Sequence, residues 1–331
     1  MNEPGRSKVP PGTRMFAIVG PTGVGKTALS VSIAPSLSAE IISVDSMQVY
    51  VGMDIGTSKP TAQQRSAVQF HMLDVVDPGT GFSVARFKEL ADDAARDVLE
   101  RGRLPLLVGG SGLYYRAVVD DLDFSCVQAA DGTGDRLEDL HEISDTELHQ
   151  LLRDLDGKAA DTILPSNRRR VLKAIEVARS GDRLISERQP SWSDYRSPYE
   201  LTVVGLEMNR RLLYRLIDER VDAMMAAGLA DEVARLREQG LRRGTTAGEA
   251  LGYRQLIDCL DEKSSLDRAT AEIKTRTRNF AKRQLTWFRK DPRVKWFEVQ
   301  AGSSASTNDV NGALAVTAGR VLEYLQHKLE N

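Results

Sequence analysis

The sequence predicts an α/β fold, in which a P-loop-type parallel sheet is covered by helices and carries a mainly helical insertion domain. Three observations lead to this prediction. Short apolar runs alternate with stretches of helical composition, as in parallel sheets that are covered on both faces. A glycine-rich loop follows the first apolar run. Near residue 120 the chain becomes acidic and helix-prone, which is unlike the sheet-forming part before it.

Each expected strand is a short apolar or β-branched run, which is typical of buried strands. The expected strands are Met15–Gly20, Glu40–Val44, Leu104–Val108, Leu201–Leu206 and Val294–Val299. The helices are predicted from composition and from where breaking residues stop the pattern. The expected helices are Lys26–Ala34, Phe87–Arg101, Arg211–Ala227, Asp231–Gln239, Tyr253–Leu260 and Leu266–Phe288.

Changes in composition also predict the domains. Residues 1–13 are polar and rich in Pro and Gly, so we expect a disordered tail. Residues 14–119 and 196–331 are expected to form the catalytic core with its C-terminal helices. Residues 120–195 are expected to form the helical insertion, because twelve acidic residues oppose only Arg136 and Arg153 between residues 120 and 156.

The overall composition excludes several classes of protein. The 331 residues are 41% hydrophobic and 28% charged, with a net charge of −2, as in an ordinary soluble protein. Cys126 and Cys259 are far apart and predict neither a disulfide framework nor a zinc site. No apolar run approaches the roughly 18 residues that span a membrane. We therefore expect a cytoplasmic protein that does not contact membranes.

The sequence "GPTGVGKT" fits the phosphate-loop pattern GxxxxGK[ST]. In such loops glycines let successive N–H groups point at one anion, at the start of a helix. Lys26 adds a positive charge, and the Thr27 hydroxyl can bind Mg²⁺ or phosphate. The predicted phosphate-binding residues are Gly20, Pro21, Thr22, Gly23, Val24, Gly25, Lys26 and Thr27. Many such loops bind ATP or GTP, but here the strand Leu104–Val108 ends in glycines and not in the Asp that usually directs Mg²⁺.

Asp45 directly follows the second expected strand. The carboxyl ends of neighbouring parallel strands share one crevice, where ligands bind, so we expect Asp45 to face the same pocket as the phosphate loop. Two interpretations of its position remain open. Asp45 caps a turn or helix, or it acts as a general base or Mg²⁺ partner beside the phosphate group.

Two basic stretches suggest an RNA-binding surface. Between residues 268 and 295, ten basic residues oppose two acidic ones, and Phe280, Trp287 and Phe288 lie among them. Phosphate contacts supply most of the sequence-independent affinity for nucleic acids. The alternative is a solvated helix face whose aromatic side chains, Trp287 and Phe288 above all, belong to the core. The second stretch is Arg168–Arg170, where positive charge at a helix start opposes the helix dipole.

Seven segments together resemble the tRNA dimethylallyltransferases, which are also called tRNA isopentenyltransferases. In order along the chain they are "GPTGVGKT" (20–27), "IISVDSMQVYVGMDIGTSKP" (41–60), "HMLDVVDP" (71–78), "LLVGGSGLYYRAV" (106–118), "RRRVLKAIEV" (168–177), "ALGYRQL" (250–256) and "KTRTRNFAKRQLTWFRK" (274–290). The resemblance spans roughly residues 15–290. The second and last segments are the most specific to the family.

The resemblance implies a reaction. The dimethylallyl group of dimethylallyl diphosphate passes to N6 of the adenosine on the 3′ side of the tRNA anticodon, and diphosphate is released. A phosphate loop with Lys26, Thr27 and Mg²⁺ suits a diphosphate leaving group. An N6 amine must lose a proton as it attacks, and Asp45 is placed to accept that proton. The family assigns Asp45 the same role, and it suggests a monomer.

The resemblance also implies tRNA contacts with the anticodon stem-loop. The residues expected to make them are Asp45, Ser46, Met47, Gln48, Ser111, Arg169, Arg170, Val171, Leu172, Lys173, Glu249, Ala250, Leu251, Gly252, Tyr253, Arg254, Lys282 and Arg283. Arg220 is expected to reach the diphosphate, although Arg215 fits equally well by spacing. The target adenine must leave its stack to react.

The chain departs from the family in places. Ser111 stands where Thr is usual, Lys173 stands where Arg is usual, and the acidic segment 120–157 follows the family poorly. An acidic segment repels RNA, so we expect it to face away from the tRNA or to contact it only through its rim. Two other functions stay open: an adenylate isopentenyltransferase that acts on free adenine nucleotides, and a P-loop kinase or NTPase. His71 is expected to be a structural hydrogen-bonding residue.

Overall fold

The computed structural model describes residues 9–122, 140, 142–179, 184–188 and 194–331. Contacts divide the chain into two compact units, a core unit up to Asp121 and from Ser197 on, and a helical unit over Leu122–Arg196. The insertion domain expected from the sequence covers 120–195. Among the described residues, no helix is long and apolar enough to span a membrane.

The core unit is built on one six-stranded sheet whose order is β3-β2-β4-β1-β5-β6. All neighbouring strands are parallel. The strands are β1 (Arg14–Val19), β2 (Ala39–Ser43), β3 (Phe70–His71), β4 (Leu104–Gly109), β5 (Glu200–Met208) and β6 (Val294–Val299). This confirms the predicted α/β class. The two-residue strand β3 was not predicted, because two residues carry no periodicity.

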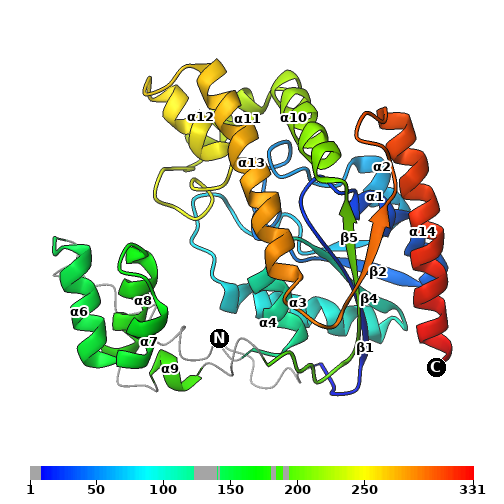
Figure 1. Cartoon of the computed structure of the whole chain (residues 1–331), viewed down its shortest axis with the longest axis horizontal. Coiled ribbons are helices and arrows are strands. Elements are labelled where there is room, and N and C mark those ends of the chain that lie inside the picture. Colours follow the sequence, from blue (N-terminus) through cyan, green and yellow to red (C-terminus); the bar gives the residue numbers. More distant parts are fainter. Residues whose placement is uncertain (1–8, 123–139, 141, 180–183, 189–193) are drawn as a thin grey trace. The chain divides into compact units, whose positions relative to one another are not determined.

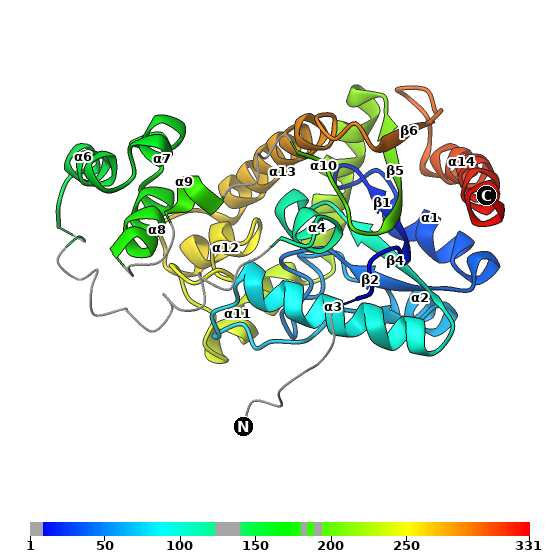
Figure 2. The same ribbon diagram turned by 90° about the horizontal axis from the view of Figure 1, so that it is seen from below.

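Helices cover both faces of this sheet (Figures 1 and 2). Alternate residues of β1 enter two different cores, because successive side chains of a strand point to opposite faces. Ala17 packs with Phe87 of α3 (Val84–Glu100), whereas Ile18 packs with Leu29 of α1 (Lys26–Ile33). The other helices and the 3₁₀ turn of this unit are η1 (Pro35–Leu37), α2 (Ala62–Ala67), α4 (Gly112–Val119), α10 (Arg210–Ala226), α11 (Leu229–Glu238), α12 (Tyr253–Leu260), α13 (Leu266–Phe288) and α14 (Thr307–Glu330).

Two parts of the core unit differ from the prediction. Helix α14, which is 24 residues long, was not named from the sequence. It begins at a capping box formed by Ser306 and Asp309, and it packs on the face that α1 covers. The tail expected over 1–13 is wrong for its last residues, since Val9 is buried in the core and the N–H of Gly12 donates to the carbonyl of Pro198 (2.7 Å). Residues 1–8 lie outside the described part.

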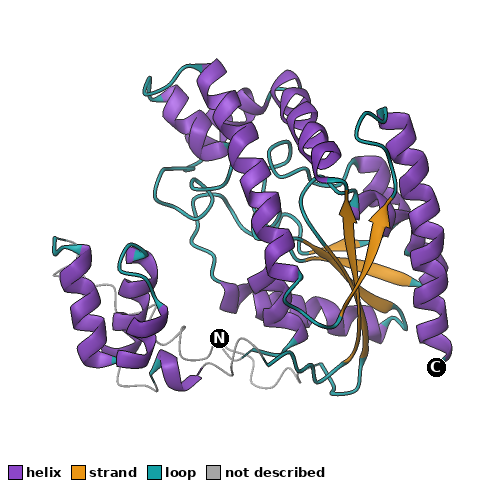
Figure 3. Cartoon of the chain, in the orientation of Figure 1, coloured by secondary structure: helices purple, strands orange, loops and turns teal. Residues whose placement is uncertain are grey.

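The helical unit has a small core of its own. It contains α6 (Asp145–Leu155), α7 (Gly157–Thr162), α8 (Arg168–Arg179) and α9 (Ile185–Arg188), which Figure 3 shows without a strand among the described residues. Leu148, Leu152, Val171 and Ile175 are fully buried between these helices. Most of the acidic segment 120–157 before α6 lies outside the described residues.

Candidate active site

The phosphate loop connects β1 to α1. Gly20 has φ 142°, and a Cβ atom there would lie 2.6 Å from the carbonyl oxygen of Leu206 on β5. Gly25, the residue before α1, has φ 94° in the left-handed region. Side chains are strained in such conformations. The glycines therefore let the loop curl against β5 and present its N–H groups at the start of α1.

Lys26 folds back onto its own loop. Its Nζ donates to the carbonyl oxygens of Gly20 (3.0 Å) and Pro21 (2.8 Å). The pKa of Lys26 is lowered to about 7, mainly by burial and to a smaller extent by Arg220, while Asp45 acts in the opposite direction. A bound anion would favour the charged form. The ammonium is therefore held in place by hydrogen bonds that a phosphate oxygen can replace.

Asp45 caps a turn and also faces the cavity. Its Oδ1 accepts from the N–H of Met47 (2.9 Å) and of Gln48 (3.4 Å), which is a side-chain cap of the following turn. Asp45 lines the same cavity as Thr22 and Arg220. The two interpretations of Asp45 are thus compatible, because one oxygen fixes the turn and the carboxylate still faces the ligand space.

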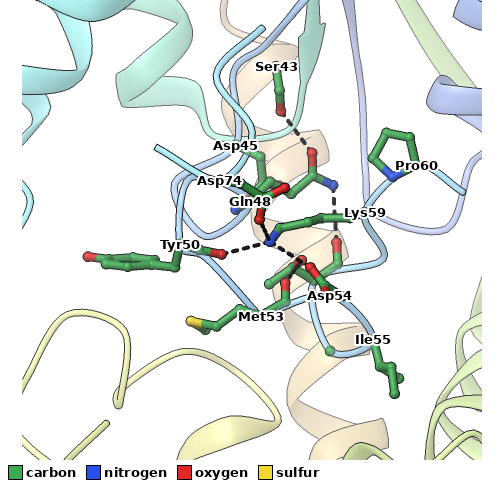
Figure 4. A network of polar contacts seen from close by, with 12 residues as sticks. Ser43, Asp45, Gln48, Tyr50, Met53, Asp54, Ile55, Lys59, Pro60 and Asp74 are labelled. Atoms are coloured by element: carbon green, nitrogen blue, oxygen red, sulfur yellow. Dashed lines mark hydrogen bonds and ion pairs between the residues drawn. The ribbon is translucent and has the colours of Figure 1, made fainter. Parts of the chain in front are cut away.

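The loop after Asp45 is held by a buried lysine (Figure 4). The Nζ of Lys59 donates to the carbonyl of Tyr50 (2.7 Å) and to Asp54 (2.7 Å), and it also binds Asp74. Burial alone would raise the pKa of Asp74, but the hydrogen bonds from Lys59 and Arg65 outweigh it and lower that pKa.

Gln48 closes the same loop, as Figure 4 also shows. Its Oε1 accepts from the hydroxyl of Ser43 at the end of β2 (2.8 Å), and its Nε2 donates to the carbonyl of Thr57 (3.1 Å). Gln48 therefore fixes the shape of the loop that carries Asp45, Ser46 and Met47. The predicted contact of Gln48 with tRNA competes with these internal bonds.

Arg220, and not Arg215, lies beside the phosphate loop. The Nη2 of Arg220 donates to the hydroxyl of Thr22 (2.7 Å), and Arg220 lines the cavity. Burial lowers its pKa, while Asp45 opposes that shift. Arg215 binds the carbonyl of Ala305 and the carboxylate of Glu219. Spacing along α10 did not separate the two residues, but the direction of each side chain does.

Glu232 of α11 is a buried carboxylate that sequence reasoning missed. It accepts from the N–H groups of Asp54 (3.1 Å), Ile55 (2.8 Å) and Gly56 (3.3 Å), and from the hydroxyl of Tyr253 (2.6 Å). Burial and Glu232 raise the pKa of Tyr253. Glu232 therefore joins the loop after β2 to the start of α12. Its only sequence signal is an acidic residue at an apolar-periodic position of a helix.

A cavity of about 440 Å³ is lined by Thr22 of the phosphate loop, Asp45 and Arg220. Its polar end contains Thr22, Asp45 and Arg220. An apolar wall is formed by α10, α11 and α13 through the side chains of Val221, Met224, Leu229, Ile273 and Phe280. The arrangement suits a ligand with one anionic group and one apolar group. The carboxylate that lines the cavity beside such a ligand is Asp45, which follows the end of β2.

Several residues predicted to contact tRNA line this cavity too. They are Asp45, Ser46, Met47, Ser111, Glu249, Ala250, Leu251, Gly252, Tyr253, Arg254 and Arg283. Ser111 accepts from the N–H of Ser46 (3.2 Å), so that the ends of β4 and β2 meet. Tyr253 is fully buried, and its hydroxyl is engaged by Glu232.

In the helical unit, α8 carries the predicted contacts 169–173. Val171 is fully buried in the core of that unit, so its side chain does not face the solvent. Helical periodicity turns Val171 inward, while Arg170 is exposed and Lys173 pairs with Glu176 (2.9 Å). Arg168 binds the carbonyls of Leu140 and Ile143, which gives the charge at this helix start a structural reason.

Helix α13 carries fewer available cations than its sequence suggests. Carboxylates pair with three of them, Lys274 with Asp222, Arg276 with Glu272 and Arg278 with Asp218, and Glu207 pairs with Arg289 directly after the helix. Lys282 and Arg283 are exposed and form no ion pair with any residue that the structure describes. Phe288 is fully buried and Trp287 half-buried, as the core interpretation predicts.

Two further predictions concern His71 and the binding of a metal ion. The Nε2 of His71 lies 2.7 Å from Glu40, which also binds Arg101, so His71 has structural hydrogen-bonding partners away from the loop. Within the described ranges, no group of three His, Cys, Asp or Glu side chains could hold a metal ion. Mg²⁺ is commonly bound through substrate phosphates and few protein ligands.

Fold and cavity together define the class: an α/β enzyme with a phosphate loop at the carboxyl edge of a parallel sheet. Residues 48–291 match the family described as IPP transferase, and residues 13–74 match that described as isopentenyl transferase. The chain belongs to the IPP transferase family. This confirms the resemblance noted in the sequence.

Individual relatives agree with this membership. A tRNA dimethylallyltransferase of Halalkalibacterium halodurans is 42% identical over 287 residues, which cover 86% of this chain and 91% of the relative. That of Moorella thermoacetica is 43% identical over 315 residues, covering 93% of this chain and 96% of the relative. The tRNA isopentenylpyrophosphate transferase structure from Bacillus halodurans matches with a TM-score of 0.63 and 38% identity, over 95% of this chain and 99% of that one.

A eukaryotic dimethylallyltransferase, solved acting on tRNA, matches with a TM-score of 0.74 and 25% identity. The match covers 94% of this chain and 80% of that chain. The chain thus spans nearly the full length of the bacterial relatives and most of the eukaryotic one.

Proposed function

We propose that the protein transfers the dimethylallyl group of dimethylallyl diphosphate to N6 of the adenosine 3′-adjacent to the anticodon of a tRNA. The observation that carries this proposal is the cavity that Asp45 lines together with Thr22, Arg220 and apolar side chains of α10, α11 and α13. The diphosphate fits the polar end, the prenyl group fits the apolar wall, and the carboxylate lies where an incoming amine would lose its proton.

The reaction balances with these groups. The N6 nitrogen forms a bond to the allylic carbon, the carbon–oxygen bond of the donor breaks, and the diphosphate leaves with the electron pair. Asp45 accepts the N6 proton. Lys26 and Arg220 stabilise the charge that develops on the diphosphate, together with the N–H groups of the loop. Donors placed in advance at a developing anion are often the largest contribution to such rate enhancements.

Mg²⁺ is part of the proposal. The Thr27 hydroxyl, in the first turn of α1, would be the protein ligand, and the diphosphate and water would supply the remaining oxygens. The donor set fits a hard cation that keeps several waters. Bound there, Mg²⁺ would neutralise charge on the leaving group.

The tRNA contacts are proposed for both units. The anticodon stem-loop would be held by Arg170 and Lys173 of the helical unit and by Lys282 and Arg283 of the core unit, in a monomer that works in the cytoplasm. A single-stranded loop is where proteins usually read RNA sequence. The adenine would enter the cavity after leaving its stack.

The test is prenyl transfer measured in parallel on unmodified tRNA and on AMP, with dimethylallyl diphosphate and Mg²⁺. We expect prenylated adenosine next to the anticodon and no product on AMP. Transfer to AMP alone would show an adenylate isopentenyltransferase. ATP hydrolysis without prenyl transfer would show a P-loop NTPase and overturn the proposal.

A further inference from the structure

Gln284 of α13 joins three segments that are far apart in the sequence. Its Oε1 accepts from the backbone N–H of Thr22 in the phosphate loop (2.8 Å). Its Nε2 donates to the carbonyl oxygen of Gly110 at the end of β4 (2.9 Å). Only 6% of Gln284 is exposed, so both bonds lie in the interior, where hydrogen bonds are costly to lose. The amide of Gln284 therefore satisfies the N–H of Thr22 in the phosphate loop and the carbonyl of Gly110 in the loop after β4.

The amide of Gln284 packs closely against the backbone of Gly110. A Cβ atom on Gly110 would lie 2.2 Å from Nε2 of Gln284 and 3.2 Å from the carbonyl oxygen of Gly20. The glycine thus allows α13 to approach both loops closely. Two residues on, a Cβ atom on Gly112 would lie 2.4 Å from the ring of Trp287. Helix α13 is consequently seated on the loop that carries Ser111.

The bond to Thr22 acts on the anion site itself. The N–H of Thr22 is directed at Gln284, and its hydroxyl accepts from Arg220 (2.7 Å). Thr22 is therefore fixed from two helices, α13 and α10. The carbonyl of its neighbour Pro21 holds the ammonium of Lys26 (2.8 Å). A shift of Gln284 would move the loop segment against which both cations are placed.

The exposed side of the same helix turn carries two residues that are proposed to bind RNA. Lys282 and Arg283 directly precede Gln284, and both are exposed. The buried side of α13 is formed by Thr277, Ala281, Gln284 and Phe288, at the spacing of one helix face. Protein interiors are close-packed, so RNA binding that moves the exposed face of this turn also moves its buried face.

We propose that Gln284 is a positioning residue that couples RNA binding on α13 to anion binding in the phosphate loop. The inference rests on the proposed function in its assignment of tRNA to α13. When tRNA is seated on Lys282 and Arg283, the turn is held, and the hydrogen bond from the N–H of Thr22 to Gln284 keeps the phosphate loop in its binding shape. tRNA binding therefore tightens diphosphate binding, and the reverse holds by thermodynamic linkage.

The experiment measures the Kd of Mg²⁺-pyrophosphate by calorimetry with and without saturating unmodified tRNA. For the unaltered protein we expect tRNA to lower this Kd about fivefold or more, as in typical coupled sites. In Gln284→Leu we expect the Kd without tRNA to rise about tenfold, because two buried hydrogen bonds are lost. The effect of tRNA on that Kd should fall to about onefold, whereas the affinity for tRNA alone stays within about twofold.

Gln284→Glu distinguishes positioning from packing. A carboxylate still accepts from Thr22 but cannot donate to Gly110, and it places negative charge beside the anion. Its protonated form regains the donor. The ratio of its pyrophosphate Kd to that of the unaltered protein should thus shrink as pH falls from 8 to about 5.5. A side chain that merely fills space would give a constant ratio.

Ala281→Gly is the matched control. It loosens the buried face of the same turn but keeps both hydrogen bonds, so the coupling between tRNA and pyrophosphate should survive. Equal loss of coupling in Ala281→Gly and Gln284→Leu would overturn the proposal, and so would an unaltered protein whose pyrophosphate Kd ignores bound tRNA. A protein that binds no tRNA at all would instead refute the proposed function, which the prenyl-transfer assay tests separately.

Discussion

At the scale of single residues, Asp45 and Lys26 each combine a structural contact with a proposed role in the reaction. Asp45 caps the turn over Met47 and Gln48 through Oδ1, and its carboxylate faces the cavity. Lys26 is held by the carbonyls of Gly20 and Pro21 and is proposed to bind the diphosphate. A substitution at either position therefore changes both local structure and chemistry, and the variants must separate the two.

Asp45→Asn separates them for Asp45. The amide oxygen still accepts from the N–H of Met47, but the base is gone. We expect turnover to fall about 10²–10⁴-fold, with the melting temperature and the affinity for tRNA nearly unchanged. Asp45→Ala should lose turnover equally and also about 0.5–2 kcal/mol of stability, as for a lost side-chain cap. Full activity in Asp45→Asn would leave Asp45 a purely structural role.

The lowered pKa of Lys26 predicts proton uptake on anion binding. In the free protein its pKa is about 7, so above that pH most of the ammonium has lost its proton. A bound diphosphate raises the pKa, so the proton is taken up on binding and the affinity falls as pH rises above 7. Calorimetry of Mg²⁺-pyrophosphate binding at pH 8, in buffers of different ionisation enthalpy, counts that proton.

Lys26→Arg is the control for this measurement, since arginine stays charged over the whole range. The proton count should drop toward the value that pyrophosphate itself contributes. An equal proton count in both proteins would assign the uptake to another group.

At the scale of elements, α13 serves the cavity, the phosphate loop and the outer surface at once. It lines the cavity with Ile273 and Phe280, reaches Thr22 through Gln284 and exposes Lys282 and Arg283. Its length of 23 residues lets one helix do this. Three of its other cations, Lys274, Arg276 and Arg278, are paired with carboxylates. Among the described residues, the exposed cations of the helix without an ion pair are Arg268 in the first turn and Lys282 and Arg283 in its second half.

The distribution of ion pairs along α13 predicts which of its cations contribute to the affinity for tRNA. Replacing Lys282 and Arg283 by Ala should weaken tRNA binding and reduce the slope of log affinity against log salt by about 1–2, since each phosphate contact contributes roughly one unit. The matched control replaces Lys274 and Arg278, which are bound to Asp222 and Asp218. Filter binding from low to high salt measures both. Equal slopes for the two double variants would remove Lys282 and Arg283 from the interface.

The elements were predicted more completely than the side-chain partners. The bounds of α12, α13 and β6 agree with the expected ones, because their ends are marked by Gly252, Ser265 and the residues after Pro292. Gln284 and Glu232 escaped prediction, since their partners lie 262 and 178 positions away and a buried polar residue on a helix gives no local signal. The sequence did not separate Arg220 from Arg215, whereas the structure places Arg220, and not Arg215, beside the phosphate loop.

At the scale of the whole molecule, the chain consists of two units with separate cores. The helical unit buries Leu148, Leu152 and Val171 within itself. The core unit continues directly across the insertion, because the hydroxyl of Ser197 donates to the carbonyl of Val119 (2.5 Å). The phosphate loop, Asp45 and the cavity all belong to the core unit. The groups proposed to bind the anion therefore lie in the core unit, whereas Arg170 and Lys173 lie in the helical unit.

Replacing residues 122–196 by a short Gly-Ser linker tests this division. The ends to be joined are adjacent in the core unit, so closing a short loop costs little entropy. We expect a folded protein that binds Mg²⁺-pyrophosphate as the full chain does, because no group at the polar end of the cavity is removed. Its affinity for tRNA should fall about tenfold or more, ~1.4 kcal/mol, since Arg170 and Lys173 are lost.

Val171→Asp in the full chain provides the companion variant. A charge buried in the core of the helical unit should unfold that unit alone, so calorimetry should show a separate transition lost while pyrophosphate binding persists. The tRNA affinity should then match that of the deletion. Loss of pyrophosphate binding in both variants would mean that the core unit depends on the helical unit for its fold, and the two would have to be treated as one cooperative structure.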